Sequence, residues 1–293
     1  MRTIQNRALV ACNGCGGEET TLYAASPEGD RVVRCARCGL IYTNPRLRTD
    51  LTGQRLDDGD QEELAKDYGA ERALYRARFD ERLDWMASRL PSDARVLDIG
   101  CAWGYFLDQG RRRGLQMYGV EISPRTAAFA KQACPNVHVG ELGTAPWPER
   151  FFDAATLWHT LEHLPDPSGV LRQVHRLLKP GGRLFLEVPD IGSRIAQNQK
   201  ERWVHFRPLS HLYYFDRTTL GALLEKTGFI CDRAEGVSQG TGWGDCLRRL
   251  GLGWATRALL AHLPGLVTAV RSRLMRSRRA ETDVLIVAAT RSE

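Results

Sequence analysis

Four cysteines near the N-terminus form two pairs with the spacing of metal ligands. The pairs stand in CNGC (12–15) and CARC (35–38), and 19 residues separate them. Two Cys-x-x-Cys pairs at such a distance supply the tetrahedral ligand set of zinc. Gly16 and Gly39 follow the pairs directly, where a tight turn favours a residue without a Cβ atom. The sequence therefore predicts a Zn²⁺ ion held by Cys12, Cys15, Cys35 and Cys38.

A closed site of four thiolates is structural, so we expect the ion to stabilise the fold of a small zinc-ribbon lobe over residues 1–50. Such a lobe can also bind RNA or a substrate. Residues 1–50 carry seven Arg against five Asp and Glu, and the zinc–thiolate group adds a charge of −2. The lobe is then close to neutral, which disfavours binding to a phosphate backbone. No nucleic-acid partner is expected.

A second stretch whose residues could bind a ligand is RVLDIGCAWGYFL, residues 95–107. Its apolar run predicts a strand that ends near Asp98, followed by a turn from Gly100 to Gly104 that opens a helix. Backbone N–H groups gather at such a turn. The second glycine of a dinucleotide fingerprint is missing, so pyrophosphate fits poorly. Asp98 would repel phosphate but can accept a hydrogen bond from an ammonium group, which suits a cofactor that carries an amino acid.

Further acids follow the next two predicted strands. Glu121 ends the second strand, 23 residues after Asp98. A carboxylate at that place can accept hydrogen bonds from both hydroxyls of an unmodified ribose. Glu141 and Leu142 follow the third strand and offer an acid and an apolar face to an adenine ring.

The elements that must position these residues alternate along the chain. We expect a linker over 43–60 and a helix over 61–90, which Pro91 ends. Short apolar runs and helical stretches then alternate, which predicts parallel strands with helices on both faces. The predicted strands cover 95–99, 116–121, 136–139, 151–158, 182–188, 229–235 and 283–289.

The bulk composition is that of an ordinary globular protein. The chain has 293 residues, of which 43% are hydrophobic and 26% charged. It has no run of the roughly 18 apolar residues that a membrane span needs, and its N-terminus lacks a signal-peptide pattern. We therefore expect a cytoplasmic protein. The four other cysteines are interpreted as small packing residues: Cys101, Cys134, Cys231 and Cys246.

The positive charge is concentrated in one segment. Residues 246–280 contain eight Arg and no acid, and without them the net charge of +6 becomes −2. The segment is a partly amphipathic helical stretch with a break at Pro264. A solvated helical face is one interpretation. Contact with an acidic ligand or with an anionic membrane surface is the other.

Taken together, the motifs resemble those of the class I S-adenosylmethionine-dependent methyltransferases. The matching stretches are VLDIGCAWG, GVEIS and the long segment from FFDAATLWHTLEHLPDP to LLKPGGRLFLEVP. EHLPDP and LLKPGG resemble the branch with ubiquinone-type O-methyltransferases, and the added four-cysteine lobe is similar to some sugar and natural-product methyltransferases. The resemblance covers about 95–235 and the last strand.

This resemblance implies an α/β fold, a Rossmann-like, seven-stranded, doubly wound sheet whose last strand is antiparallel. The methyltransferase domain would span 92–293, with 51–91 as linker and helix and a basic helical insertion at 240–281. S-adenosylmethionine is the implied cofactor. By the same likeness Asp98 and the turn hold its methionine part, Glu121 holds its ribose, and Glu141 and Leu142 flank its adenine. Ile122 is a further expected cofactor-binding residue. The turn residues concerned are Gly100, Cys101, Ala102 and Gly104, with Ala102 in place of the family's usual glycine.

Methyl transfer to a hydroxyl needs alignment and a base. His159 follows the fourth predicted strand, at the edge where open α/β sheets bind ligands, and His163 lies one helical turn further. Both are candidate catalytic bases. His205 and His211 either line the substrate pocket or serve as core or loop residues. Glu162 with His163 supplies too few ligands to predict a Mg²⁺ site.

The sequence thus predicts an enzyme that O-methylates a small molecule such as a sugar or natural-product intermediate. One alternative is an RNA methyltransferase that uses the zinc lobe for recognition. The other is a non-catalytic subunit with a methyltransferase fold, to which only Ala102 points. The acceptor and the oligomeric state cannot be read from the sequence, because a fold indicates a class of chemistry and not a substrate.

Overall fold

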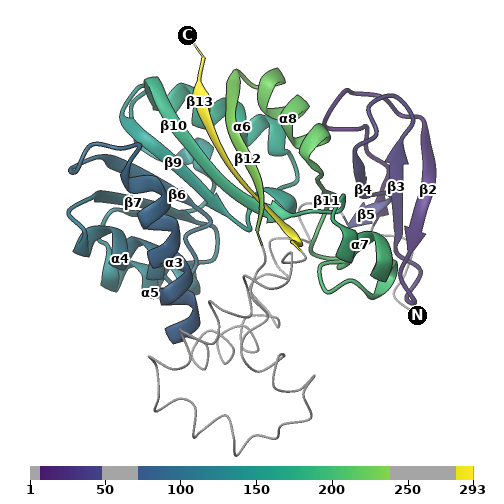
Figure 1. Ribbon diagram of the computed structural model, residues 1–293, viewed down its shortest axis with the longest axis horizontal. Coiled ribbons are helices and arrows are strands. Elements are labelled where there is room, and N and C mark those ends of the chain that lie inside the picture. The colour runs from purple at the N-terminus through teal and green to yellow at the C-terminus, as the bar shows by residue number, and fades with distance from the viewer. Residues whose placement is uncertain (1–6, 48–71, 238–281, 293) are drawn as a thin grey trace, which may run out of the picture.

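The computed structural model describes residues 7–47, 72–237 and 282–292. Within these ranges, seven strands form one sheet in the order β12-β13-β10-β9-β6-β7-β8 (Figure 1). The strands are β6 (Arg95–Ile99), β7 (Gln116–Glu121), β8 (Val137–Val139), β9 (Phe152–Trp158), β10 (Leu178–Pro189), β12 (Phe229–Val237) and β13 (Val284–Arg291). The middle strands run parallel, whereas β13 is antiparallel to both β10 and β12. This confirms the predicted doubly wound sheet with an antiparallel last strand.

Each predicted strand has a counterpart in the structure. The predicted and observed first residues differ most for β10. It begins at Leu178, four residues before the predicted range of 182–188, and its register against β9 shifts between Leu178 and Arg183. The irregular stretch is KPGG, which reads as a turn in the sequence. The residues before the bulge show no alternation of apolar and polar side chains, so this alternation could not predict that residues 178–181 belong to the strand.

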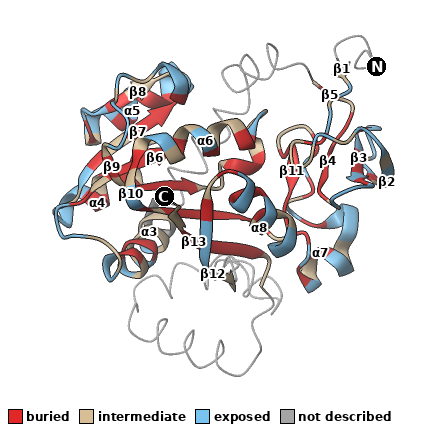
Figure 2. Ribbon diagram, turned by 90° about the horizontal axis from the view of Figure 1, so that it is seen from above, coloured by how far each residue is buried: buried red, intermediate tan, exposed pale blue. Residues whose placement is uncertain are grey.

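Helices cover both faces of the sheet (Figures 1 and 2). Their bounds are α3 Arg72–Ala87, α4 Tyr105–Arg112, α5 Pro124–Ala133, α6 Pro167–Leu177 and α8 Arg217–Lys226. One buried cluster joins α3, α4 and α5 to Val96, Ala154 and Phe185 of the sheet. A second buried cluster joins α6 and α8 to Leu97 and Leu186 of the sheet. Alternate residues of a strand point to opposite faces, which produces these two layers of core.

Of the predicted helix 61–90, the described part is α3, which begins at Arg72 and ends at Ala87. Residues 61–71 and most of the predicted linker lie outside the described residues. So do the Arg-rich segment 246–280 and the predicted insertion around it.

The N-terminal lobe is a small antiparallel sheet of β2 (Thr20–Ala25), β3 (Arg31–Cys35) and β4 (Ile41–Thr43), and β1 (Arg7–Ala8) pairs with β5 (Arg46–Leu47). Its fourth strand is β11 (Tyr213–Tyr214), which lies between η4 and α8 of the large domain in the sequence and pairs with β4. The lobe therefore shares a sheet with the large domain.

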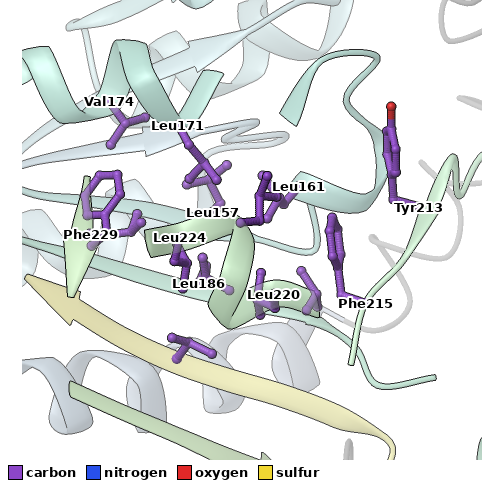
Figure 3. Packing of buried hydrophobic residues seen from close by; sticks show 14 of the residues in the cluster. Leu157, Leu161, Leu171, Val174, Leu186, Tyr213, Phe215, Leu220, Leu224 and Phe229 are labelled. Carbon is purple, nitrogen blue, oxygen red and sulfur yellow. The ribbon is translucent and has the colours of Figure 1, made fainter. Parts of the chain in front are cut away.

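The lobe and the large domain also share one hydrophobic core. Leu40 and Tyr42 of the lobe belong to the same buried cluster as Leu157, Leu161 and Phe215 of the large domain. Figure 3 shows part of this cluster, with Leu157 and Leu161 close to the side chains from α6 and α8. The loops after β9 and before α8 are thus anchored from two sides.

Three short helical segments complete the edge of the sheet near the lobe: η3 (Leu161–His163), α7 (Arg194–Gln199) and η4 (Lys200–Arg202). A further 3-10 turn, η2 (Leu142–Thr144), follows β8. The described residues contain no helix that is both long and apolar enough to span a membrane.

Candidate active site and cysteine cluster

The four N-terminal cysteines converge in the lobe. Their sulfur atoms all lie within 4.8 Å of one another. The Sγ atoms of Cys12 and Cys38 are 3.5 Å apart, as are those of Cys15 and Cys35, and all four are free thiols. Gly16 has φ 74° and donates to the carbonyl of Cys12 at 2.7 Å, which closes the first turn. This donor set fits a tetrahedral four-thiolate site.

The surroundings of the cluster favour the thiolate form at one position. Burial raises the pKa of Cys35, but backbone N–H groups of Cys38 and Arg37 outweigh that and lower it to about 7. A thiolate is the form that binds a metal.

The turn after β6 has the backbone that the sequence requires. Gly100, Ala102 and Gly104 all lie in the left-handed region, with φ of 73°, 44° and 77°. A Cβ atom on Gly100 would lie 2.6 Å from Thr160 Oγ1, and one on Gly104 would lie 2.8 Å from the Ala130 Cα atom. Glycine is therefore needed at both ends of the turn for space as well as for conformation. Ala102 adopts the same region with a side chain, at a cost of roughly 1–2 kcal/mol.

Glu121 holds this turn directly. Its Oε2 accepts a hydrogen bond from the Ala102 backbone N–H at 3.0 Å, and its Oε1 accepts one from the Ser123 N–H at 3.0 Å. The backbone N–H groups of Gly100 and Cys101 donate to the Val120 carbonyl. The ends of β6 and β7 are thus joined, and the carboxylate lies at the carboxyl edge of the sheet. Ribose and phosphate groups bind at this edge in open α/β sheets.

Asp98 is buried beneath the turn. Its side chain accepts a hydrogen bond from Thr156 Oγ1 at 2.6 Å. Burial raises the pKa of Asp98 to about 7, against the opposing effect of the Thr156 hydrogen bond and with a further contribution from Glu121. The group thus changes charge near neutral pH, and a cationic ligand would favour its ionised form.

Asp98 and the turn residues line one wall of a cleft. The cleft is formed by Phe79, Asp98, Gly100, Cys101, Ala102, Trp103, Tyr105 and Trp158. Among the other predicted cofactor residues, Ile122 is 48% exposed and Glu141, directly before η2, is exposed, whereas Leu142 is buried. The structure therefore brings the predicted cofactor residues to one edge of the sheet, after β6, β7 and β8.

His159 lies between two buried carboxylates. Its Nδ1 is 3.2 Å from Glu162 Oε1, and its Nε2 is 3.1 Å from Glu187 Oε1. Burial alone would lower the pKa of His159, but these two hydrogen bonds raise it to about 9. Both ring nitrogens then donate, so His159 is an imidazolium near neutral pH. Its backbone, with φ 51°, is also in the left-handed region.

His163 has a different environment. Its Nδ1 is 2.8 Å from the Ser210 carbonyl oxygen, which can only accept, so Nδ1 carries the hydrogen. In the neutral imidazole, Nε2 then carries the lone pair, and this atom lies 4.0 Å from Glu162 Oε1. The ring also packs edge-on against His211, with centroids 4.7 Å apart.

Two further histidines complete this group. The Nδ1 atom of His211 is 2.8 Å from the His205 carbonyl oxygen, and the His205 ring stacks on His159 with centroids 6.0 Å apart. Burial lowers the pKa of His211 to about 3 and that of His205 to about 4, so both are neutral. The sequence left their function open, and the structure gathers them beside His159 and His163.

Sequence reasoning missed Glu187 and Arg82. Glu187 lies on β10 and contacts His159 through one oxygen, while its Oε2 accepts from Arg82 Nε of α3 at 2.5 Å. Hydrogen bonds from His159 and Arg82 lower the pKa of Glu187 well below its usual range despite burial. An acid inside an apolar strand was the available signal, since a buried acid needs a partner.

Comparison with known proteins identifies the large domain. The family model described as "Methyltransferase domain" matches residues 70–233. A "Ubiquinone biosynthesis O-methyltransferase" of Xanthomonas oryzae is 34% identical over 120 residues, which is 36% of this chain and 47% of that protein. Its namesake in Xanthomonas campestris is 39% identical over 115 residues, with the same coverage. The match therefore spans about half the length of these curated relatives.

Solved structures agree on the fold. A SAM-dependent methyltransferase of Thermotoga maritima, described as a possible histamine N-methyltransferase, superposes with a TM-score of 0.54. The superposition covers 79% of this chain and 98% of that one at 20% identity. At this identity the likeness concerns the fold alone.

Proposed function

The chain belongs to the methyltransferase domain family, and from this premise we propose that it transfers a methyl group to a hydroxyl oxygen of a small molecule. The observation that carries the proposal is the position of the histidine–glutamate group. Thr160, which contacts the Gly100 turn, lies between His159 and Glu162 in the same loop. Side chains that can accept or donate a hydroxyl proton thus lie in the loop beside the proposed cofactor-binding turn. The resemblance to O-methyltransferase relatives supports the same chemistry.

S-adenosylmethionine, which the family uses, supplies an electrophilic methyl group on a sulfonium, and its leaving group is a neutral thioether. The residues present fit this cofactor. Asp98 offers a buried carboxylate for the ammonium of its methionine part, and Glu121 offers one for the ribose hydroxyls. Leu142 gives the adenine an apolar contact. Asp98 lies near the end of β6, Glu121 is the last residue of β7, and Leu142 follows β8, so the sheet holds the three side chains at fixed separations.

Of the two candidate bases, the geometry favours His163. A general base needs a free lone pair within reach of the hydroxyl. Both ring nitrogens of His159 are engaged by Glu162 and Glu187. In its neutral form, His163 has its lone pair on Nε2, because Nδ1 donates to the Ser210 carbonyl. His159 then acts as a fixed positive charge that positions Glu162.

We also propose that the cysteine cluster holds structural Zn²⁺ and that the acceptor is a sugar or natural-product intermediate. The closed four-thiolate set supports zinc. The lobe shares β11 with the large domain, which supports a structural role rather than a separate recognition module. Strong salt dependence of acceptor binding would instead favour an RNA acceptor.

The test is calorimetric binding of S-adenosylmethionine, followed by a screen of hydroxylated sugars and natural-product intermediates for formation of the demethylated cofactor. We expect micromolar binding that Glu121→Ala weakens at least tenfold, or about 1.4 kcal/mol. The matched control is Glu225→Ala, because Glu225 is an exposed acid on α8. Absence of binding to folded, zinc-loaded protein would reject the proposal. Turnover of amines but not of alcohols would reject the hydroxyl acceptor.

A further inference from the structure

Three side chains beside the proposed acceptor site form what we call the acceptor cluster: Glu162, His163 and His211. Each offers one ligand atom, and these atoms all lie within 4.8 Å of one another. Glu162 is 1% exposed and His211 is 6% exposed, whereas His163 is half-buried. Glu162 and His163 come from η3, and His211 comes from the segment before β11. The sequence alone could not bring the third residue to the other two.

Backbone carbonyl groups fix the orientation of both histidines. The Nδ1 atom of His163 donates to the Ser210 carbonyl, and that of His211 donates to the His205 carbonyl, each at 2.8 Å. The lone pair of each ring is therefore on Nε2. Metal-binding histidines almost always donate their other ring N–H to a carbonyl or carboxylate in this way. The two histidines share this arrangement and lie in edge-to-face contact, so both can bind one ion.

Glu162 supplies an oxygen that needs a partner. Its Oε1 is engaged by His159, but its buried Oε2 has no hydrogen-bond partner among the described residues. A buried carboxylate oxygen without a partner is costly, so a cation or a donor is expected there. The backbone at Glu162 is hydrogen-bonded as well, since its carbonyl accepts from the Leu212 N–H at 2.8 Å. This bond also ties the His211 segment to η3.

We propose that Glu162, His163 and His211 bind a divalent first-row transition cation, distinct from the ion of the cysteine cluster. Two imidazoles and one carboxylate favour zinc, manganese, iron or cobalt over Mg²⁺ and Ca²⁺, which take mainly oxygen ligands. Three protein ligands leave coordination positions open, as catalytic sites do. The inference rests on the proposed O-methyl transfer and deepens it, because the open position takes the acceptor hydroxyl.

The cation changes how the acceptor hydroxyl loses its proton. The acceptor's oxygen binds the cation, and its O–H bond breaks, with the proton released to water past the His163 side chain, which is 36% exposed. A bound cation lowers the pKa of an oxygen ligand. The oxygen's electron pair forms the new C–O bond as the methyl C–S bond breaks, and the sulfur keeps the pair of that broken bond. With the ion bound, His163 serves as a ligand and the cation takes over the ionisation of the hydroxyl.

The test uses the full chain with zinc already in its cysteine cluster, titrated with Co²⁺ and followed by calorimetry and visible absorption. We expect one Co²⁺ to bind in addition to the zinc. His211→Gln and Glu162→Gln should each weaken it at least tenfold. The matched control is His175→Gln, because His175 lies on α6 away from the cluster. S-adenosylmethionine binding by each variant verifies that the large domain remains folded.

No cobalt binding beyond the cysteine cluster, or equal binding by both variants and the wild type, would overturn the inference. Methyl transfer to an alcohol at an unchanged rate after removal of the second ion would also overturn it, while leaving the proposed function intact. Cobalt binding without any methylation of alcohols would support the metal site and reject the proposed function.

Discussion

Thr43 of the cysteine lobe holds the backbone of His211 in the acceptor cluster. Its Oγ1 lies 3.2 Å from the His211 carbonyl oxygen and 3.2 Å from that of Pro208. Its backbone N–H donates to the Leu212 carbonyl at 2.9 Å. Thr43 is 1% exposed, so these contacts are shielded from water. The lobe therefore holds in place the segment that carries His211.

Loss of the Thr43 hydroxyl should weaken acceptor use without affecting the cofactor. In Thr43→Val the carbonyl groups of Pro208 and His211 lose their donor, at a cost of about 1–3 kcal/mol. We expect a higher KM or a lower kcat for the acceptor and an unchanged Kd for S-adenosylmethionine. Thr218→Val is the control, because Thr218 lies exposed on α8. If Thr43→Val weakened cofactor binding as much as acceptor use, the lobe would stabilise the whole fold and not the acceptor region alone.

Glycine at position 102 should stabilise the protein. Ala102 lies at φ 44°, where a Cβ atom is unfavourable and glycine is not. We expect Ala102→Gly to raise the free energy of unfolding by about 1 kcal/mol. The Ala102 N–H that donates to Glu121 remains, so cofactor binding should persist. Urea unfolding and calorimetry measure the two quantities, and a less stable variant would contradict the expectation.

Binding of S-adenosylmethionine should strengthen as the pH rises from 6 to 8. The pKa of Asp98 is raised to about 7 by burial, so the fraction of carboxylate grows across this range. The carboxylate attracts the cofactor's ammonium group, and binding should therefore release protons. Calorimetry in buffers of different ionisation enthalpy measures that release. In Asp98→Asn the pH dependence should disappear; a slope that persists in this variant would assign it to another group.

The ion pair of Arg82 and Glu187 should contribute strongly to stability. Both side chains are buried, and Glu187 also holds His159. Removal of one partner leaves a buried charge, so Arg82→Met should cost about 3–5 kcal/mol. Chemical unfolding measures this. Arg113→Met is the matched control, because Arg113 pairs with exposed acids, including Asp80 at 2.9 Å, and should cost at most about 1 kcal/mol. Similar losses of unfolding free energy in the two variants would contradict the expectation that the buried pair matters more than the exposed one.

The sequence by itself determined the features that arise from local pattern and spacing. The alternation of strands and helices, the Gly100–Gly104 turn with its acids at Asp98 and Glu121, and the four cysteines all depend on residues near each other in the chain. The period of a strand and the reach of a Cys-x-x-Cys turn are local properties. The start of β10 was missed because a bulge interrupts that period.

Only the tertiary structure decided which distant residues meet. β11 adds to the sheet of the lobe, and Arg82 reaches Glu187 from α3. His211 joins His163 and Glu162, which lie 48 and 49 residues before it. His159 follows a strand as predicted, but only the tertiary structure brings the carboxylates of Glu162 and Glu187 to its ring. The charge of a histidine and the direction of its lone pair depend on such partners, so no spacing rule could have distinguished His163 from His159.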